Sequence, residues 1–385
     1  MILSLIVYTA TGAIMAWLGW HVNRREQQVL ARGGAELPFL SWEIVMAMLI
    51  YVAVSSVRWL TSWDYNMYYG YYVSMQSLGD YSRENFEPGF ALITNAMARA
   101  GFHFAFYFAL WAAAQILLLY YALRHRKALL PWIALCIFLG PYYIFWMGFV
   151  RQSVVEALFV LMVELIVRRK FWYYLLLSFL AISIHKMCVL FIPLYFVPLI
   201  KVPNAKRWMA FALIALCFVL GSFPQWIQWI FDRLGYLADV LGYGHYYRLF
   251  MSNNLEYTFR PVMGPARLCP LLTCLMIIWY YPALCQMFSR DKYLPALFRF
   301  SVVYMAYINL LANTTQYMTR PGELMRSCFL VMVCFLLHYL WRQRKWIPFA
   351  VLAFLSFYYV YYEIAKAALV GGSIYAPELY HTFLF

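Results

Sequence analysis

Charged residues are scarce in this chain: Asp, Glu, Lys and Arg together make up 12% of its 385 residues. Acidic residues are the rarer kind, with 16 Asp and Glu against 30 Lys and Arg. Apolar residues make up 65% of the chain and the mean hydropathy is +0.67. A soluble domain does not have this composition, so the sequence predicts an all-α polytopic membrane protein.

The chain also lacks several patterns that would indicate other classes. Its eight cysteines lie in or beside apolar runs without metal-site spacing, so we expect free thiols, no metal site and no cofactor. The N-terminal run has no basic start and no small-residue cleavage site, which predicts a retained span. No repeat and no low-complexity linker divides residues 1–385, so we expect a single integral membrane domain.

Apolar runs predict about twelve transmembrane helices, because a span needs about 20 mostly apolar residues. The predicted spans cover approximately residues 1–20, 39–57, 101–123, 130–149, 152–167, 171–185, 187–200, 208–223, 269–288, 296–318, 327–340 and 346–365. The runs that begin at 187 and 327 are the shortest.

Basic residues cluster at alternate connections between these runs. The clusters are Arg24, Arg25 and Arg32; Arg124, Arg126 and Lys127; Arg168, Arg169 and Lys170; Lys201, Lys206 and Arg207; Arg290 and Lys292; and Arg342, Arg344 and Lys345. The positive-inside rule places these connections in the cytoplasm and both termini on the outer side. Because the clusters are short and tied to helix ends, they argue against nucleic acid as a partner.

The opposite, outer side collects an unusual number of ionisable residues, and Arg151 is the most informative of them. Arg151 and Gln152 lie in a very short reversal between two spans, and Glu156 follows Gln152 by one helical turn. A charge inside the membrane is costly, which favours a paired or functional role. An outer arginine can bind phosphate through two parallel hydrogen bonds, or it can extend to the lipid headgroups.

A polar stripe is predicted on the tenth span. Asn309, Asn313, Gln316 and Arg320 follow one another at helical spacing toward the outer surface, and Arg326 opens the next span. The stripe predicts the wall of a hydrated cavity with two arginines at its mouth. Hydrogen bonding between helices is the alternative for the amides.

The outer segments 58–100 and 224–268 are predicted to form the active-site side. The first supplies Asp64 and also Glu87, which starts a re-entrant or interfacial helix that ends near Arg99. Its tyrosines, Tyr68 among them, suit either an interfacial belt or stacking on sugars. The second segment predicts an amphipathic interfacial helix from Trp226 to Leu241.

The ordered set of these residues resembles the EpsG-type family of bacterial polysaccharide polymerases, a branch of the Wzy-like enzymes. The matching residues are Arg58, Asp64 with Tyr65 and Tyr68, Glu87 to Phe90, Arg151 with Gln152, the basic turn Arg168 to Phe171, and His185 after an apolar run. Lys186 departs from the pattern, in which a small residue follows the histidine.

The resemblance implies a glycosyltransferase of the bacterial inner membrane with a GT-C-like fold. Its substrate would be an undecaprenyl-diphosphate-linked oligosaccharide, which it would polymerise at the periplasmic face into O-antigen, capsule or exopolysaccharide. Membrane lipid surrounds such an enzyme, and a chain-length regulator or flippase is a candidate protein partner.

The residues are consistent with this chemistry. Arg58, Arg151, Arg320 and Arg326 are the predicted diphosphate ligands, because arginines can offset the charge of a leaving diphosphate without a metal. Asp64, Glu87 and His185 are the candidates for the base, with the carboxylates placed first. Gln152, Glu156, Tyr68, Asn313 and Gln316 are expected to support the cavity.

Two other classes of protein remain open at this point. A single-sugar transferase or O-antigen ligase would use the same arginines. A flippase for lipid-linked glycans would also need a cationic cavity, but it should have an inner gate and often internal symmetry.

Overall fold

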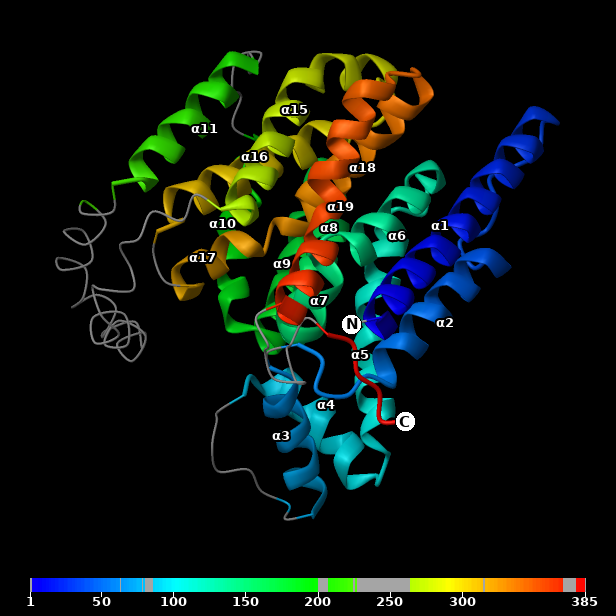
Figure 1. Ribbon diagram of the computed structural model, residues 1–385, viewed down its shortest axis with the longest axis vertical. Helices are drawn as coiled ribbons and strands as arrows, with labels where there is room; N and C mark the ends of the chain where they lie inside the picture. Colours follow the sequence, from blue (N-terminus) through cyan, green and yellow to red (C-terminus); the bar gives the residue numbers. More distant parts are fainter. Residues whose placement is uncertain are drawn as a thin grey trace.

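In the computed structural model the described residues are 2–62, 64–77, 79, 86–199, 207–223, 226, 264–313, 316–369 and 379–384. Helices form most of them (Figure 1), so the all-α prediction is confirmed. The helices are α1 (Ile2–Ala31), α2 (Trp42–Ser56), α3 (Tyr65–Ser77), α4 (Pro88–Arg99), α5 (Phe104–Ala122), α6 (Leu130–Leu139), α7 (Tyr142–Gly148), α8 (Val150–Val167), α9 (Phe171–Ile184), α10 (Phe191–Leu194), α11 (Arg207–Gly221), α15 (Pro265–Met287), α16 (Leu294–Leu310), α17 (Gln316–Glu323), α18 (Arg326–Arg342) and α19 (Trp346–Leu369).

Several of these helices can cross a membrane. Among the described residues, four are long and apolar enough: Ile2–Ala31, Phe104–Ala122, Pro265–Met287 and Trp346–Ala367. A fifth span is possible if Lys127–Leu139 and Tyr142–Gly148, which are bent by 66° relative to each other, count as one. The chain is therefore a multi-pass membrane protein, whereas the count of twelve spans and the GT-C-like fold stay predictions.

Besides 130–149, which is divided into α6 and α7, two predicted spans differ from the structure. Residues 187–200 do not form one helix: their described part consists of the 3-10 turns Lys186–Leu190 and Val197–Leu199 around the short α10. Pro193 and Pro198 account for the breaks, because proline lacks the N–H that a continuous helix needs. The predicted helix over 296–318 is also wrong, since α16 ends at Leu310 and α17 begins at Gln316.

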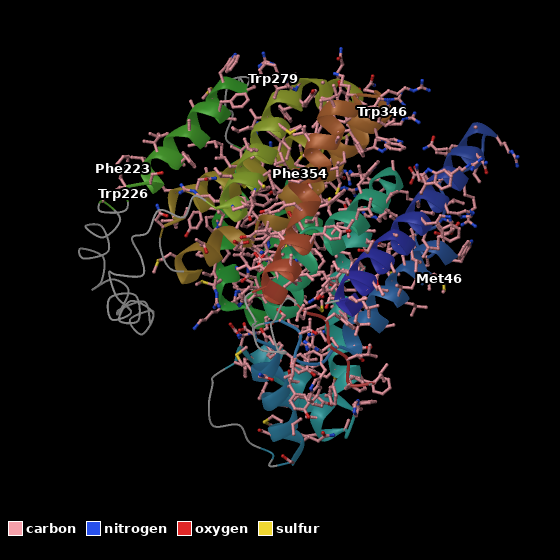
Figure 2. All side chains as sticks on the ribbon, viewed as in Figure 1. Met46, Phe223, Trp226, Trp279, Trp346 and Phe354 are labelled. Atoms are coloured by element: carbon pink, nitrogen blue, oxygen red, sulfur yellow. The ribbon has the colours of Figure 1, made fainter. Side chains whose placement is uncertain are left out.

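Apolar side chains on the outside of the bundle mark the surface that faces lipid. Figure 2 labels Met46 on α2, Trp279 on α15, and Trp346 and Phe354 on α19. Their exposed fractions are 44%, 51%, 52% and 67%. Exposed apolar surface of this extent is expected in a bilayer and is unfavourable in water.

Inside the bundle, close approach of helices depends on small residues. A Cβ on Gly19 of α1 would lie 2.8 Å from the backbone nitrogen of Pro131 at the start of α6. The absence of a side chain at Gly19 therefore lets α1 and α6 pack backbone against backbone, as small residues do between membrane helices.

Ion pairs join the basic connections at one end of the molecule. Arg124 donates to Glu164 at 2.8 Å, at the C-terminal end of α8, and Arg126 pairs with Asp291 just before α16. Lys127 pairs with Glu26 near the end of α1. Connections that the positive-inside rule assigned to one compartment thus touch one another.

The other end holds the predicted outer segments. Figure 1 shows α3 and α4 beyond the rest of the bundle, beside the start of α5. The two terminal segments also meet at this side, because the Tyr380 backbone N–H donates to Ser4 Oγ at 2.9 Å. The C-terminal segment then runs beside the loop after α2 through a β-bridge between Arg58 and Thr382.

Candidate active site

Three helix ends meet around Arg151. Arg151 lies in the first turn of α8, Glu87 occupies the N-cap position of α4, and His185 follows the last residue of α9. These positions agree with the sequence prediction for each residue. Arg151, Glu87, His185 and Tyr68 are called the Arg151 cluster below.

Glu87 is the centre of the Arg151 cluster. Its Oε2 accepts a hydrogen bond from Arg151 Nη1, and its Oε1 accepts one from the backbone N–H of Lys186 at 3.0 Å. His185 Nδ1 lies 3.7 Å from the same Oε1, which is too long for a hydrogen bond but close enough for electrostatic attraction. One carboxylate therefore connects α4, α8 and the end of α9.

Gly89 allows this meeting of helices. A Cβ at Gly89 would lie 2.8 Å from the backbone oxygen of Ser183 in the last turn of α9. Because glycine has no Cβ, α4 can begin directly against the end of α9, and Glu87 reaches the Lys186 N–H.

Aromatic rings surround the guanidinium of Arg151. The Arg151 Cζ lies 4.8 Å from the ring centre of Phe86 and 5.4 Å from that of Phe90. Arg151 Nε also donates to the Tyr68 hydroxyl at 3.4 Å. A cation among rings is shielded from water, so its attraction for an anion is stronger than at an open surface.

The Arg151 cluster fixes the protonation state of Glu87. Burial acts to raise the pKa of the Glu87 carboxyl, but His185, the charge of Arg151 and the Lys186 N–H outweigh it and lower the pKa to about 2. At neutral pH Glu87 is therefore ionised and a weak base. Loss of the Arg151 charge would raise this pKa and make Glu87 a stronger base.

Asp64 and Arg320 lie around the same cluster. Asp64 directly precedes α3, its backbone oxygen accepts from the Tyr68 N–H at 3.2 Å, and its charge acts on the Tyr68 hydroxyl together with that of Arg151. Arg320 of α17 lies over the ring of Phe149 at 5.5 Å and within electrostatic range of His185. The fold thus gathers Asp64, Arg320 and the Arg151 cluster in one region.

A second group of charges surrounds Glu156, which is fully buried. Arg326 Nη2 donates to Glu156 Oε1 at 3.0 Å, and Gln152 Nε2 donates to the same oxygen at 2.9 Å. Arg326 Nη1 also lies 3.1 Å from Glu323 Oε2. Two carboxylates therefore hold Arg326, and its predicted role as a diphosphate ligand stays a prediction.

Arg58 points into the protein. It is 1% exposed, its Nη1 donates to the Ser55 carbonyl at 2.6 Å, and its guanidinium lies 4.2 Å from the ring centre of Phe108. This placement favours support of the loop after α2, and diphosphate binding by Arg58 stays a prediction.

The predicted polar stripe does not lie on one helix, because α16 ends before Asn313. Asn309 Nδ2 donates to the Met305 carbonyl, and Asn313 Nδ2 donates to the Gly221 carbonyl of α11, both at 2.8 Å. Asparagine side chains that bond backbone in this way favour helix ends. The side chain of Gln316 and nearly all of 224–268, with its predicted interfacial helix, lie outside the described residues.

Some partners in this region were not predicted from the sequence. Packing of the helices brings the Lys186 N–H to Glu87 and Phe86 to Arg151. It also brings Glu323 to Arg326, and Tyr304 to Glu323. Among the described residues, no group of three or more His, Cys, Asp or Glu could hold a metal ion.

A comparison with protein families identifies the family of this chain. The model of the EpsG family matches residues 42–375. The chain belongs to the EpsG family. The matched region contains the Arg151 cluster, Asp64, Arg320 and the Glu156 group. No curated protein and no solved structure matches the chain. Membership of the EpsG family indicates a membrane-bound polysaccharide polymerase that uses a lipid-linked sugar substrate.

Proposed function

We propose that this EpsG-family protein polymerises undecaprenyl-diphosphate-linked repeat units at the periplasmic face of the bacterial inner membrane. The observation that carries the proposal is the Arg151–Glu87 ion pair at the meeting point of three helix ends. An arginine paired with a carboxylate is a site where an anionic substrate can take the place of the carboxylate.

In the proposed reaction, a hydroxyl of the acceptor sugar attacks the anomeric carbon of the donor. The new glycosidic bond forms while the bond from that carbon to the diphosphate oxygen breaks, and its electron pair leaves with the lipid diphosphate. Arg151 and Arg320 would offset the developing negative charge, as pre-positioned cations do in other transfer reactions. The hydroxyl proton must pass to a base.

The Arg151–Glu87 pair couples these two events. When the donor diphosphate binds Arg151, Glu87 loses one of the partners that hold its pKa at about 2, and the pKa rises toward the ordinary value of 4.5. Glu87 then becomes a better proton acceptor only when substrate is present. The buried His185 ring beside it can relay or accept the proton, while Asp64 is the alternative base.

Purified protein incubated with a lipid-linked oligosaccharide tests the proposal. We expect a ladder of products that grow by one repeat unit, together with release of the lipid diphosphate. A single transfer would assign the protein to ligases or simple transferases. Unchanged substrate that crosses the membrane of proteoliposomes would identify a flippase and refute the polymerase proposal.

A further inference from the structure

A cavity of about 220 Å³ lies between the helices, beside Arg326 and Glu323 of the Glu156 group, and none of the four residues of the Arg151 cluster lines it. Side chains from α6, α7, α15, α16, α17, α18 and α19 line it. Most of its wall is apolar, with Phe145, Met305, Phe329 and Leu355 among the lining residues. Its volume is several times the ~30 Å³ that one water molecule occupies in liquid water.

Arg267 contributes an unsatisfied positive charge to this wall. The residue is 8% exposed, and its Nε and Nη1 have no hydrogen-bond partner among the described residues. Only Nη2 has acceptors, the carbonyls of Phe218 at 3.4 Å and Asn309 at 3.5 Å. A buried guanidinium in this state is costly, so an anion that binds it would be strongly stabilised.

Neighbouring groups suit an anion at this position. Arg267 lies in the first turn of α15, whose helix dipole favours negative charge there. The Ser356 hydroxyl, also without a partner among the described residues, borders the cavity and can donate a hydrogen bond. Glu323 borders it as well, and its carboxylate lies 3.1 Å from Arg326, which it shares with Glu156.

We propose that this cavity is a lipid-phosphate site, distinct from the Arg151 cluster, in which Arg267 binds the phosphate and the apolar wall holds the beginning of the hydrocarbon chain. Free phosphate would satisfy Arg267 but leave the apolar wall empty. A lipid without phosphate would leave the guanidinium unpaired. Only a phosphate attached to a chain meets both requirements.

The test measures binding to the full-length protein in detergent with three probes: farnesyl diphosphate, dioleoylphosphatidylglycerol and inorganic diphosphate. All variants carry Arg151→Gln as well, so that the Arg151 cluster does not contribute. Arg267→Gln should weaken binding of a lipid probe by at least about tenfold, since it removes charge-assisted hydrogen bonds. The control Arg207→Gln, at an arginine that lies 4.7 Å from the ring centre of Trp279, should leave binding unchanged.

A second variant keeps the charge and alters the apolar space. Leu355→Phe narrows the apolar part of the cavity and should weaken binding of the lipid probes without changing that of inorganic diphosphate. If only the binding of farnesyl diphosphate is weakened by Arg267→Gln, the ligand is an isoprenoid. If the binding of phosphatidylglycerol is weakened, the ligand is a phospholipid. Both results support a lipid-phosphate site.

The proposal is overturned if Arg267→Gln weakens the binding of neither lipid probe, or if it weakens the binding of inorganic diphosphate alone. Because the readout is binding and not turnover, these outcomes leave the polymerase proposal untouched. Failure of the polymerase assay would equally leave the cavity proposal standing.

Discussion

Replacement of Arg151 by glutamine removes the cation of the Arg151 cluster with little change in volume. In the wild type, the guanidinium is hydrogen-bonded to Glu87 and to the Tyr68 hydroxyl and is surrounded by Phe86 and Phe90. A glutamine amide can still donate to Glu87, but it carries no charge for a diphosphate. We therefore expect chain elongation to fail while the protein stays folded.

The size of the effect can be worked out from the contacts. Loss of one pre-positioned donor to a developing oxyanion costs about 3 kcal/mol, which is roughly a hundredfold in rate or more. The cost in folding is smaller, about 1 to 3 kcal/mol, because it is the loss of one charge-assisted bond. Glu87 also keeps its bond to the Lys186 N–H at 3.0 Å.

The assay is the initial rate of lipid-diphosphate release, measured beside the product ladder and the membrane abundance of each variant. Arg124→Gln is the matched control, because Arg124 pairs with Glu164 at the other end of α8. The side chains of Arg124 and Glu164 are 16% and 13% exposed, against 18% and 9% for Arg151 and Glu87. This control loses a similar ion pair without touching the site.

Arg151→Lys separates charge from geometry. Lysine restores the charge, but its ammonium lacks the planar set of donors with which the guanidinium can bind Glu87, Tyr68 and a diphosphate. We therefore expect only partial recovery of the reaction rate. The reasoning is refuted if Arg151→Gln releases lipid diphosphate within threefold of the wild-type rate. It is also refuted if Arg124→Gln reduces the rate as much.

Three further predictions concern the support of the site. Glu87→Gln should lower the melting temperature at pH 7, and the difference from wild type should shrink as pH falls from 4.5 toward 2. The reason is that the pKa of Glu87 is lowered to about 2 by folding, so its stabilisation exists above its unfolded value of 4.5 and is lost below. Gly89→Ala should destabilise the protein by about 1 to 3 kcal/mol in chemical unfolding and slow the reaction, because the new Cβ would meet the backbone of α9. Gly70→Ala is the control and should be harmless, because a Cβ there meets nothing within 4 Å. Arg58→Gln should reduce membrane abundance, with a normal rate per folded molecule; a normal abundance with a lost rate would contradict the supporting role.

Much of the local structure could be predicted from the sequence. Pro88 at the first helical position and Glu87 before it indicated the start of α4, and the short reversal indicated that Arg151 lies at the boundary between two spans. Runs of apolar residues and the alternation of basic connections indicated a membrane bundle with two unlike ends. These features depend on short stretches of chain, so hydropathy and helix-end preferences are sufficient to find them.

The pairing of charges could not be predicted in this way. Arg58, Arg151 and Arg326 look alike in sequence, since each is an arginine at an outer helix end. In the fold, Arg58 bonds backbone carbonyls, Arg326 is held by Glu156 from 170 positions away, and Arg151 shares Glu87 with the end of α9. Which carboxylate reaches which arginine depends on how the helices pack.

The sequence by itself determined the class of the protein, many of its helix ends and the residue types available for chemistry, because these follow from local composition and periodicity. The tertiary structure decided that α16 ends before its polar stripe is complete. It also decided that Arg151 pairs with Glu87 and that two guanidinium nitrogens of Arg267 have no hydrogen-bond partner among the described residues. Burial and long-range contact set the energy of a charge in a membrane protein, and neither is a property of a single segment.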